Sequence, residues 1–301
     1  MSGSITLENR FGVNKMELIS LKYAIFVIVL LVLYYCFPKK YRWYVLLAGS
    51  MAYYVIICKW YVLFIIFTIC TTYGSTIWID KLLKKQNAIV KSHKEDWDRQ
   101  TRKEYKEKGR KKRVAVMLFA LLCNFGILAF LKYIPYAGEL GLLLPLGISF
   151  YTFQSMGYVM DVYREIVEPE KNFLKVALFV SFFPQIIQGP IAIYDKLAGQ
   201  LYEGHSLRLE NLQKGALLVL WGVMKKLVIA DRAVNIINFV MDKPMDFSGT
   251  YVFFAAVVYA LQLYADFSGG IDIVRGIAEM FGITMSTNFN HPYFSRSLTE
   301  Y

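Results

Sequence analysis

The stretch "LQLYADFSGGIDIVRG", residues 261–276, joins an apolar run to a group of charges. Residues 247–265 carry no charged side chain and are nearly as long as a bilayer span, which takes about 20 apolar residues. Asp266, Asp272 and Arg275 follow directly. Charged groups are costly in hydrocarbon, and those found in membrane segments usually serve a function. The stretch therefore predicts a membrane helix and marks a candidate site.

The composition of the chain predicts a membrane protein. Of 301 residues, 56% are hydrophobic and only 19% are charged, whereas soluble domains carry about 25% charged residues. The apolar runs are too continuous for barrel strands, which alternate over about ten residues. Helices satisfy their own backbone hydrogen bonds in lipid. We therefore predict an all-α polytopic membrane protein, with residues 1–301 forming a single membrane domain.

Four apolar runs are clear candidates for membrane spans. They lie at residues 18–37, 43–58, 60–79 and 114–131. The segment between the last two, residues 80–113, is predicted to be a basic loop, because positions 81–113 hold fourteen Lys or Arg against five Asp or Glu. The positive-inside rule predicts that this loop is cytoplasmic and that the N-terminus lies outside. The loop either only sets this topology or also attracts an anionic ligand or anionic lipid.

The later apolar segments contain helix breakers. Residues 140–160 could span a membrane but carry several Gly and a Pro, and residues 176–194 hold Pro184, Gly189 and Pro190. Proline removes an amide donor and clashes with the preceding turn. We expect the second segment to be broken or re-entrant beside a cavity near "FFPQIIQGPI", because irregular backbone at membrane depth must face protein or water.

A further apolar segment, residues 217–241, is interrupted by charges. They are Lys225, Lys226, Asp231 and Arg232. Two structures fit this pattern: two short helices, or one tilted helix whose lysines extend to the membrane surface.

The charges of the opening stretch have local explanations. On a helix that begins after "SGG", Asp272, Arg275 and Glu279 share one face, which predicts ion pairs of Arg275 with each acid. Asp266 either caps that helix together with Ser268 or lines a polar path through the membrane. The four cysteines and three histidines show no spacing typical of disulfides or metal sites. We therefore predict no metal site, and we expect neither a bound cofactor nor a nucleic-acid partner.

Three blocks carry a resemblance to a known family: "LPLGISFYTFQSMGYVMDVYRE", "FVSFFPQIIQGPI" and "LQLYADFSGGIDIVRGIAEMFGITMSTNFNHPYFSRSLTEY". In this order they resemble the membrane-bound O-acyltransferase (MBOAT) family, and most of all its bacterial alginate O-acetylation branch. The resemblance implies a ring of transmembrane helices around a central tunnel in the inner membrane. It also implies acyl transfer from a thioester, with acetyl-CoA as the expected donor, to hydroxyls of an extracytoplasmic polysaccharide.

The resemblance places the catalytic histidine of the family after the "FSRSLTEY" block. The chain then corresponds to the N-terminal part of a longer protein, truncated after Tyr301, and no catalytic residue is expected within residues 1–301. His93, His205 and His291 lie in polar or interfacial stretches and do not replace it. The residues expected to line the tunnel are Gln185, Gln188, Tyr264, Asp266, Ser268, Asn288 and Asn290.

Several functions are compatible with these features. Within the family, the alternative is D-alanyl transfer to teichoic acid from an acylated carrier protein. Outside it, broken helices and intramembrane charges also occur in transporters or flippases, and a non-catalytic scaffold of a polysaccharide machine fits as well. The expected partners are the lipid bilayer and an extracytoplasmic acyltransferase or polysaccharide-assembly protein.

Overall fold

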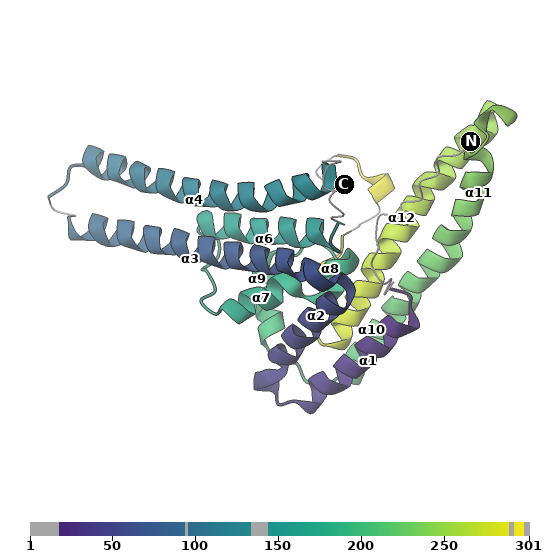
Figure 1. Cartoon of the computed structure of the whole chain (residues 1–301), viewed down its shortest axis with the longest axis horizontal. Helices are drawn as coiled ribbons and strands as arrows, with labels where there is room; N and C mark the ends of the chain where they lie inside the picture. The colour runs from purple at the N-terminus through teal and green to yellow at the C-terminus, as the bar shows by residue number, and fades with distance from the viewer. Residues whose placement is uncertain (1–17, 94–95, 134–143, 289–291, 298–301) are drawn as a thin grey trace. The chain divides into compact units, whose positions relative to one another are not determined.

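The computed structural model describes residues 18–93, 96–133, 144–288 and 292–297, and the helices in these ranges are connected without any β-strand (Figure 1). Three helical stretches are long and apolar enough to cross a membrane, namely Lys39–Ser92, Arg99–Tyr133 and Gly249–Met280. The predicted all-α, multi-pass membrane class is confirmed, whereas the ring around a tunnel stays a prediction. The predicted spans at 43–58 and 60–79 both fall within Lys39–Ser92.

The described residues form two compact units, and each is treated by itself. Unit 1 contains Leu46–Ile186 and Ile193–Tyr202. Unit 2 contains residues 18–45, Ile187–Ala192 and residues 203–297.

Unit 1 is built on a long antiparallel hairpin of two helices (Figure 1). Its helices α3 (Val62–Ser92) and α4 (Arg99–Tyr133) pack against each other and against α6 (Ile148–Tyr163). Inside the hairpin, Asn124 Nδ2 donates a 2.9 Å hydrogen bond to Thr71 Oγ1. In an apolar surrounding such a side-chain bond joins two helices that the hydrophobic effect alone does not hold together.

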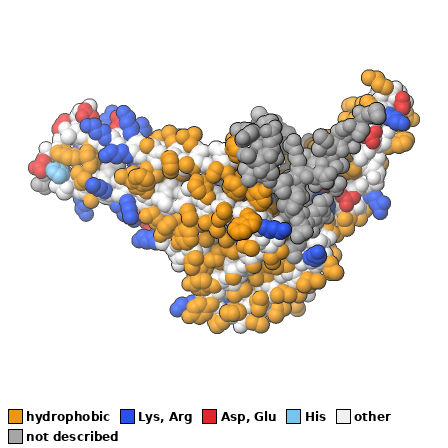
Figure 2. Space-filling view, in the orientation of Figure 1, with side chains coloured by type: hydrophobic (Ala, Val, Ile, Leu, Met, Phe, Trp, Pro, Cys, Tyr) orange, Lys and Arg blue, Asp and Glu red, His pale blue; other side chains and the backbone are white. Residues whose placement is uncertain are grey.

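The predicted basic loop is largely helical, which corrects the sequence-based expectation. Helix α3 continues to Ser92 and α4 already begins at Arg99, so only residues 93–98 connect them. Lys, Arg, Glu and Gln are good helix formers, and Lys84 lies 2.6 Å from Asp80 one turn earlier on α3. Figure 2 shows Lys and Arg side chains gathered at this end of the hairpin, beyond a largely hydrophobic surface.

The segment predicted to be broken is broken. Helix α7 (Phe173–Ser181) ends before Phe182, α8 (Phe183–Gln188) follows, and α9 (Tyr194–Tyr202) begins after an irregular stretch that contains Pro190. The interruption frees the Phe183 amide, which donates a 3.1 Å hydrogen bond to Ser50 Oγ on helix α2 (Arg42–Cys58). The side chain of Ser50 thus replaces the missing helical acceptor, as buried backbone donors require.

Unit 2 contains a second antiparallel hairpin. One arm is a continuous helix made of α10 (Leu209–Met224), a π-helical turn η4 (Lys225–Ala230) and α11 (Asp231–Met241). The other arm is α12 (Gly249–Met280), which packs along it (Figure 1). Of the two structures left open for residues 217–241, the structure has one helix, with the π-turn at the two lysines.

Helix α12 is uninterrupted, and this corrects the prediction of a helix that begins after "SGG". Ser268 and the glycines that follow lie within it, so Asp266 and Ser268 are not caps. Near its end, Tyr35 of α1 (Leu21–Cys36) donates a 2.7 Å hydrogen bond from its hydroxyl to Met280 O. Short 3-10 turns complete the described elements: η2 (Lys39–Tyr41), η3 (Lys59–Tyr61), η5 (Pro244–Asp246) and η6 (Pro292–Phe294).

Candidate functional site

The two arms of the unit 2 hairpin touch backbone to backbone at two levels. A Cβ placed on Gly222 would lie 2.5 Å from the carbonyl oxygen of Gly269, and one placed on Gly276 would lie 2.6 Å from that of Gly215. No side chain larger than hydrogen fits at such distances. Small residues that allow close approach are typical of helix pairs in membranes. The repeat of seven residues between the glycines of each arm is the sequence signal that could have predicted this contact.

Just beyond the Gly222 contact, three charged side chains meet. Lys225 Nζ lies 2.5 Å from Asp272 Oδ2, and Arg275 Nη1 lies 3.3 Å from Asp272 Oδ1. Lys225 Nζ is also 3.4 Å from Ser268 Oγ. The ion pair predicted between Asp272 and Arg275 is present. The pairing of Lys225 with Asp272 was not predicted from the sequence, because the two residues lie 47 positions apart.

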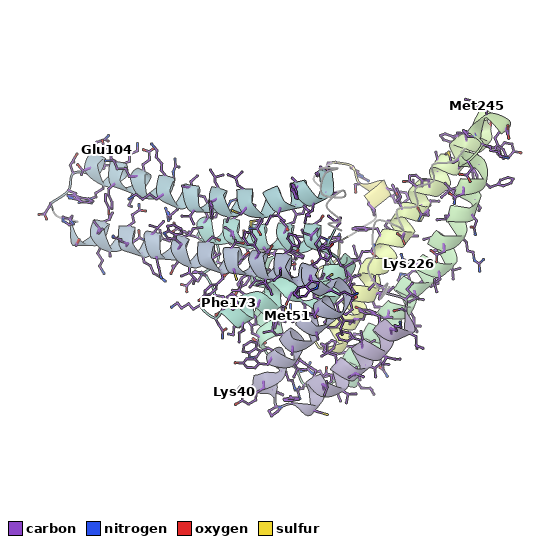
Figure 3. The ribbon with its side chains drawn as sticks, viewed as in Figure 1. Lys40, Met51, Glu104, Phe173, Lys226 and Met245 are labelled. Atoms are coloured by element: carbon purple, nitrogen blue, oxygen red, sulfur yellow. The ribbon has the colours of Figure 1, made fainter. Side chains whose placement is uncertain are left out.

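A second ion pair joins the same helices. Lys226 donates to Asp266, and Lys226 lies where its helix runs beside α12 (Figure 3). Both lysines belong to the π-turn. A π-turn holds more residues than an α-turn, so neighbouring side chains are rotated less around the axis and both lysines reach α12. Each lysine is paired with an acid of α12.

In the cluster, defined as Lys225, Lys226, Asp266, Asp272 and Arg275, the pair Lys226 with Asp266 is partly exposed, at 27% and 37%, and the other pair is largely shielded from solvent. The side chains of the Lys225 and Asp272 pair are only 14% and 12% exposed. Charges removed from water are costly unless they are paired and hydrogen-bonded. Three cations face two carboxylates, so the cluster keeps one positive charge in excess. π-turns within α-helices occur frequently at functional sites, which supports a role beyond packing.

Gln188, at the end of the broken segment, lies against α12 beside the cluster. A Cβ placed on Gly270 would lie 2.2 Å from Gln188 Oε1 and 2.9 Å from its Nε2. A larger residue at this position would require the Gln188 amide group to move. Gln188, Ser268 and Asp266, three of the residues expected to line a tunnel, thus lie close together along one stretch of α12.

The remaining predicted residues lie apart from this group. Gln185 is 2% exposed within unit 1. The Tyr264 ring makes an edge contact with Tyr293, at 5.9 Å between centroids. Asn288 is exposed, and Asn290 lies outside the described residues. Glu279 accepts a 3.0 Å hydrogen bond from Thr284 Oγ1, and no ion pair with Arg275 is found in this described stretch.

His93 and His205 lie where the sequence places them, in connecting segments. His93 follows the end of α3, and its ring stacks on Trp97 at 4.8 Å. His205 is bonded through its backbone, because its amide donates to Tyr34 Oη at 3.2 Å and its carbonyl accepts from Arg42. His291 lies outside the described residues. Among the residues described, no group of three or more His, Cys, Asp or Glu could hold a metal ion.

No family model matches the chain, but several bacterial proteins are similar to it. A peptidoglycan O-acetyltransferase of Helicobacter pylori is 31% identical over 223 residues, which are 62% of this chain and 42% of that protein. A "Probable alginate O-acetylase AlgI" of Pseudomonas syringae pv. tomato is 37% identical over 161 residues, 53% of this chain and 30% of that protein. A teichoic acid D-alanyltransferase of Bacillus subtilis is 25% identical over 162 residues, 52% and 40% of the two chains.

In each case the matched part is less than half of the relative's own length. The similarities nevertheless confirm the resemblance inferred from the three sequence blocks. They extend over more than half of this chain and include both acetylating and D-alanylating proteins. This chain is accordingly similar to proteins of the membrane-bound O-acyltransferase family.

Proposed function

We propose that this chain is part of an inner-membrane O-acyltransferase that moves an acetyl group from acetyl-CoA to hydroxyls of an extracytoplasmic polysaccharide. The observation that carries the proposal is the 31% to 37% identity with proteins named for O-acetylation of peptidoglycan and alginate. The intramembrane charge cluster supports it, because an acyl group that passes from one side of the membrane to the other needs polar surroundings at membrane depth.

The chemistry defines what the protein must supply. The attacking hydroxyl needs a base within hydrogen-bond reach of its proton, and the carbonyl oxygen of the thioester needs a donor as negative charge develops on it. His93 and His205 lie in connecting segments and are held by stacking or backbone contacts. We therefore assign neither the role of base.

The role assigned to residues 1–301 is to build and line the acyl-transfer path. The ion pairs lock α12 to the helix beside it, which holds the small polar groups of α12 in place. We propose that the path is lined by Gln188, Asp266 and Ser268. Their polar atoms lie next to the backbone of Gly269 and Gly270, which has no side chain to cover it. The basic end of the α3–α4 hairpin is proposed to face the cytoplasm and the N-terminus the outside.

A second candidate is D-alanyl transfer to teichoic acid. One observation favours it, namely the 25% identity with the Bacillus subtilis protein over a similar share of the chain. That identity is lower than the identity with the acetylating relatives, so the acetyl reading is preferred.

The test compares membranes from cells that express the gene with membranes from cells in which it is deleted. Radiolabelled acetyl-CoA and radiolabelled D-alanine are supplied in parallel, and base-labile label is measured in the envelope polysaccharide. Gene-dependent transfer of acetyl label alone is the expected result. Gene-dependent D-alanine label would favour the second candidate, and no gene-dependent label from either donor would overturn both.

A further inference from the structure

A pocket of about 490 Å³ lies between α3 and α4 at the base of the basic hairpin, within unit 1. It is lined by Leu83, Gln86, Asn87, Lys103, Lys106, Glu107, Arg110, Arg113 and Glu165. Four of these side chains are cationic and two are acidic, so the pocket carries an excess of positive charge. It is separate from the charge cluster of unit 2 and has no part in the function proposed above.

The wall of the pocket contains a buried guanidinium group with an unused donor. Arg113 is only 8% exposed, and its Nη1 donates a 2.9 Å hydrogen bond to Glu165 Oε1. Its Nε has no hydrogen-bond partner among the described residues. A buried donor without an acceptor is costly. An anion in the pocket would supply the missing acceptor.

Glu165, which pairs with this arginine, has a strained backbone conformation. It follows the end of α6 with φ at +62°, in the left-handed region where glycine is favoured at helix ends. Such outliers persist where the surroundings require them, often at ligand sites. Here the Glu165 carboxylate pairs with Nη1 of Arg113 and orients its guanidinium group.

The floor of the pocket is equally well defined. Gln86 is buried and donates a 3.1 Å hydrogen bond from Nε2 to Lys106 O. A Cβ on Gly109 would lie 2.4 Å from Gln86 Oε1, so the glycine leaves space for the Gln86 amide group between the two helices. This close approach leaves the exposed side chains of Lys106 and Arg110 at the rim.

The depth of the pocket suggests its ligand. The apolar parts of the two helices end at Ile79 and begin again at Val114. Leu83 therefore lies about 6 Å beyond the apolar edge, at 1.5 Å per residue, and Arg113 lies directly at that edge, so both fall within the head-group layer of about 5 to 7 Å that flanks the hydrocarbon. Arg and Lys together are well suited to phosphate oxygens. We propose that this pocket binds the phosphate of an anionic phospholipid.

The test uses the full chain, purified in a neutral detergent, and measures retained phosphatidylglycerol by native mass spectrometry. The variant Lys106→Gln/Arg110→Gln removes two rim cations. The matched control, Lys108→Gln/Lys112→Gln, removes two exposed cations of the same helix that do not line the pocket. We expect the first variant to weaken phosphatidylglycerol binding about 100-fold, at about 1.5 kcal/mol for each hydrogen bond to a charged group that is lost and tenfold for each 1.4 kcal/mol. The control should bind as the parent does.

The same measurement distinguishes the pocket from other causes of lipid retention. Equal losses in the two variants would show diffuse attraction by the basic hairpin and overturn the pocket. Retention of zwitterionic phosphatidylcholine as strongly as phosphatidylglycerol would also overturn it. Free pyrophosphate is the third probe, and if it displaces the lipid and binds more tightly alone, the site belongs to a soluble phosphate compound and the lipid assignment is wrong. Unchanged thermal unfolding midpoints establish that both variants are folded.

Discussion

Lys225 and Asp272, which lie 47 residues apart in the sequence, form a 2.5 Å ion pair that joins the two arms of the unit 2 hairpin. Arg275 approaches the other carboxylate oxygen of Asp272 at 3.3 Å. One acid therefore serves two cations in surroundings with little access to water. This arrangement makes the two partners unequal, because loss of the acid strands two charges and loss of the lysine strands none.

The first prediction is that Asp272→Leu destabilises the protein more than Lys225→Met does. Removing one partner of a buried pair costs about 3 to 5 kcal/mol, and the acid leaves two cations facing each other. Because Arg275 would stay unpaired in the double variant, only Lys225→Met/Asp272→Leu/Arg275→Met should recover most of the stability. The midpoints of thermal unfolding of the purified variants in detergent give their order of stability.

The control for this prediction is an ion pair of similar length in water. Lys84 and Asp80 lie 2.6 Å apart on α3, with Lys84 62% exposed. Lys84→Met should cost only about 0.3 to 0.5 kcal/mol. Equal midpoints for Lys84→Met and Asp272→Leu would mean that the cluster is as well solvated as the surface.

The second prediction concerns the close approach of the hairpin arms. Gly222→Ala and Gly276→Ala should each lower the unfolding midpoint, because the added methyl group would meet a backbone carbonyl of the other arm. Gly126→Ala on α4 is the control, since its Cβ would meet nothing within 4 Å. That change should be neutral or stabilising by about 0.5 to 1 kcal/mol, because alanine is the better helix former. Three equal effects would contradict the packing.

The third prediction separates structure from activity at Asp266. Asp266→Ala leaves Lys226 without its partner, so lower protein levels are expected. The double variant Lys226→Met/Asp266→Leu removes both charges and should restore the level. If Asp266 lines the acyl-transfer path, acetyl transfer measured at matched protein levels stays low in the double variant. Restored activity would limit Asp266 to a structural role.

The fourth prediction is that neither the histidines of the connecting segments nor His291 provides the base. Replacing His93, His205 and His291 together by Ala should leave substantial acetyl transfer in membranes, because His93 and His205 are engaged in stacking and backbone contacts. Acetyl label in envelope polysaccharide is again the measure. A loss as large as that of the gene deletion, with normal protein levels, would assign the base to one of the three.

The fifth prediction is topological. Ser92 is exposed at the end of α3, where basic residues gather. In a background without the four native cysteines, Ser92→Cys should resist a membrane-impermeant thiol reagent in intact cells and react after permeabilisation. Ready labelling in sealed cells would reverse the proposed orientation.

Much of this protein follows from local properties of the sequence. The length of the apolar runs predicts the helical membrane class, and three of the four predicted spans fall within long apolar helices. The break after α7 follows from the chemistry of proline near Pro184 and Pro190. The pair Asp272 with Arg275 is also local, because residues three apart share a face of any helix.

Only the tertiary structure determined which residues, distant in the sequence, contact these local features. Glycine weakens a helix, yet α12 continues through Gly269 and Gly270. These positions are glycines because Gly222 and Gln188 occupy the space that side chains would need. The two lysines of the π-turn pair with acids 40 and 47 residues away, a distance at which no periodicity connects them. Their partners depend on which faces of two helices meet, and backbone contact between glycines of the two arms determines those faces.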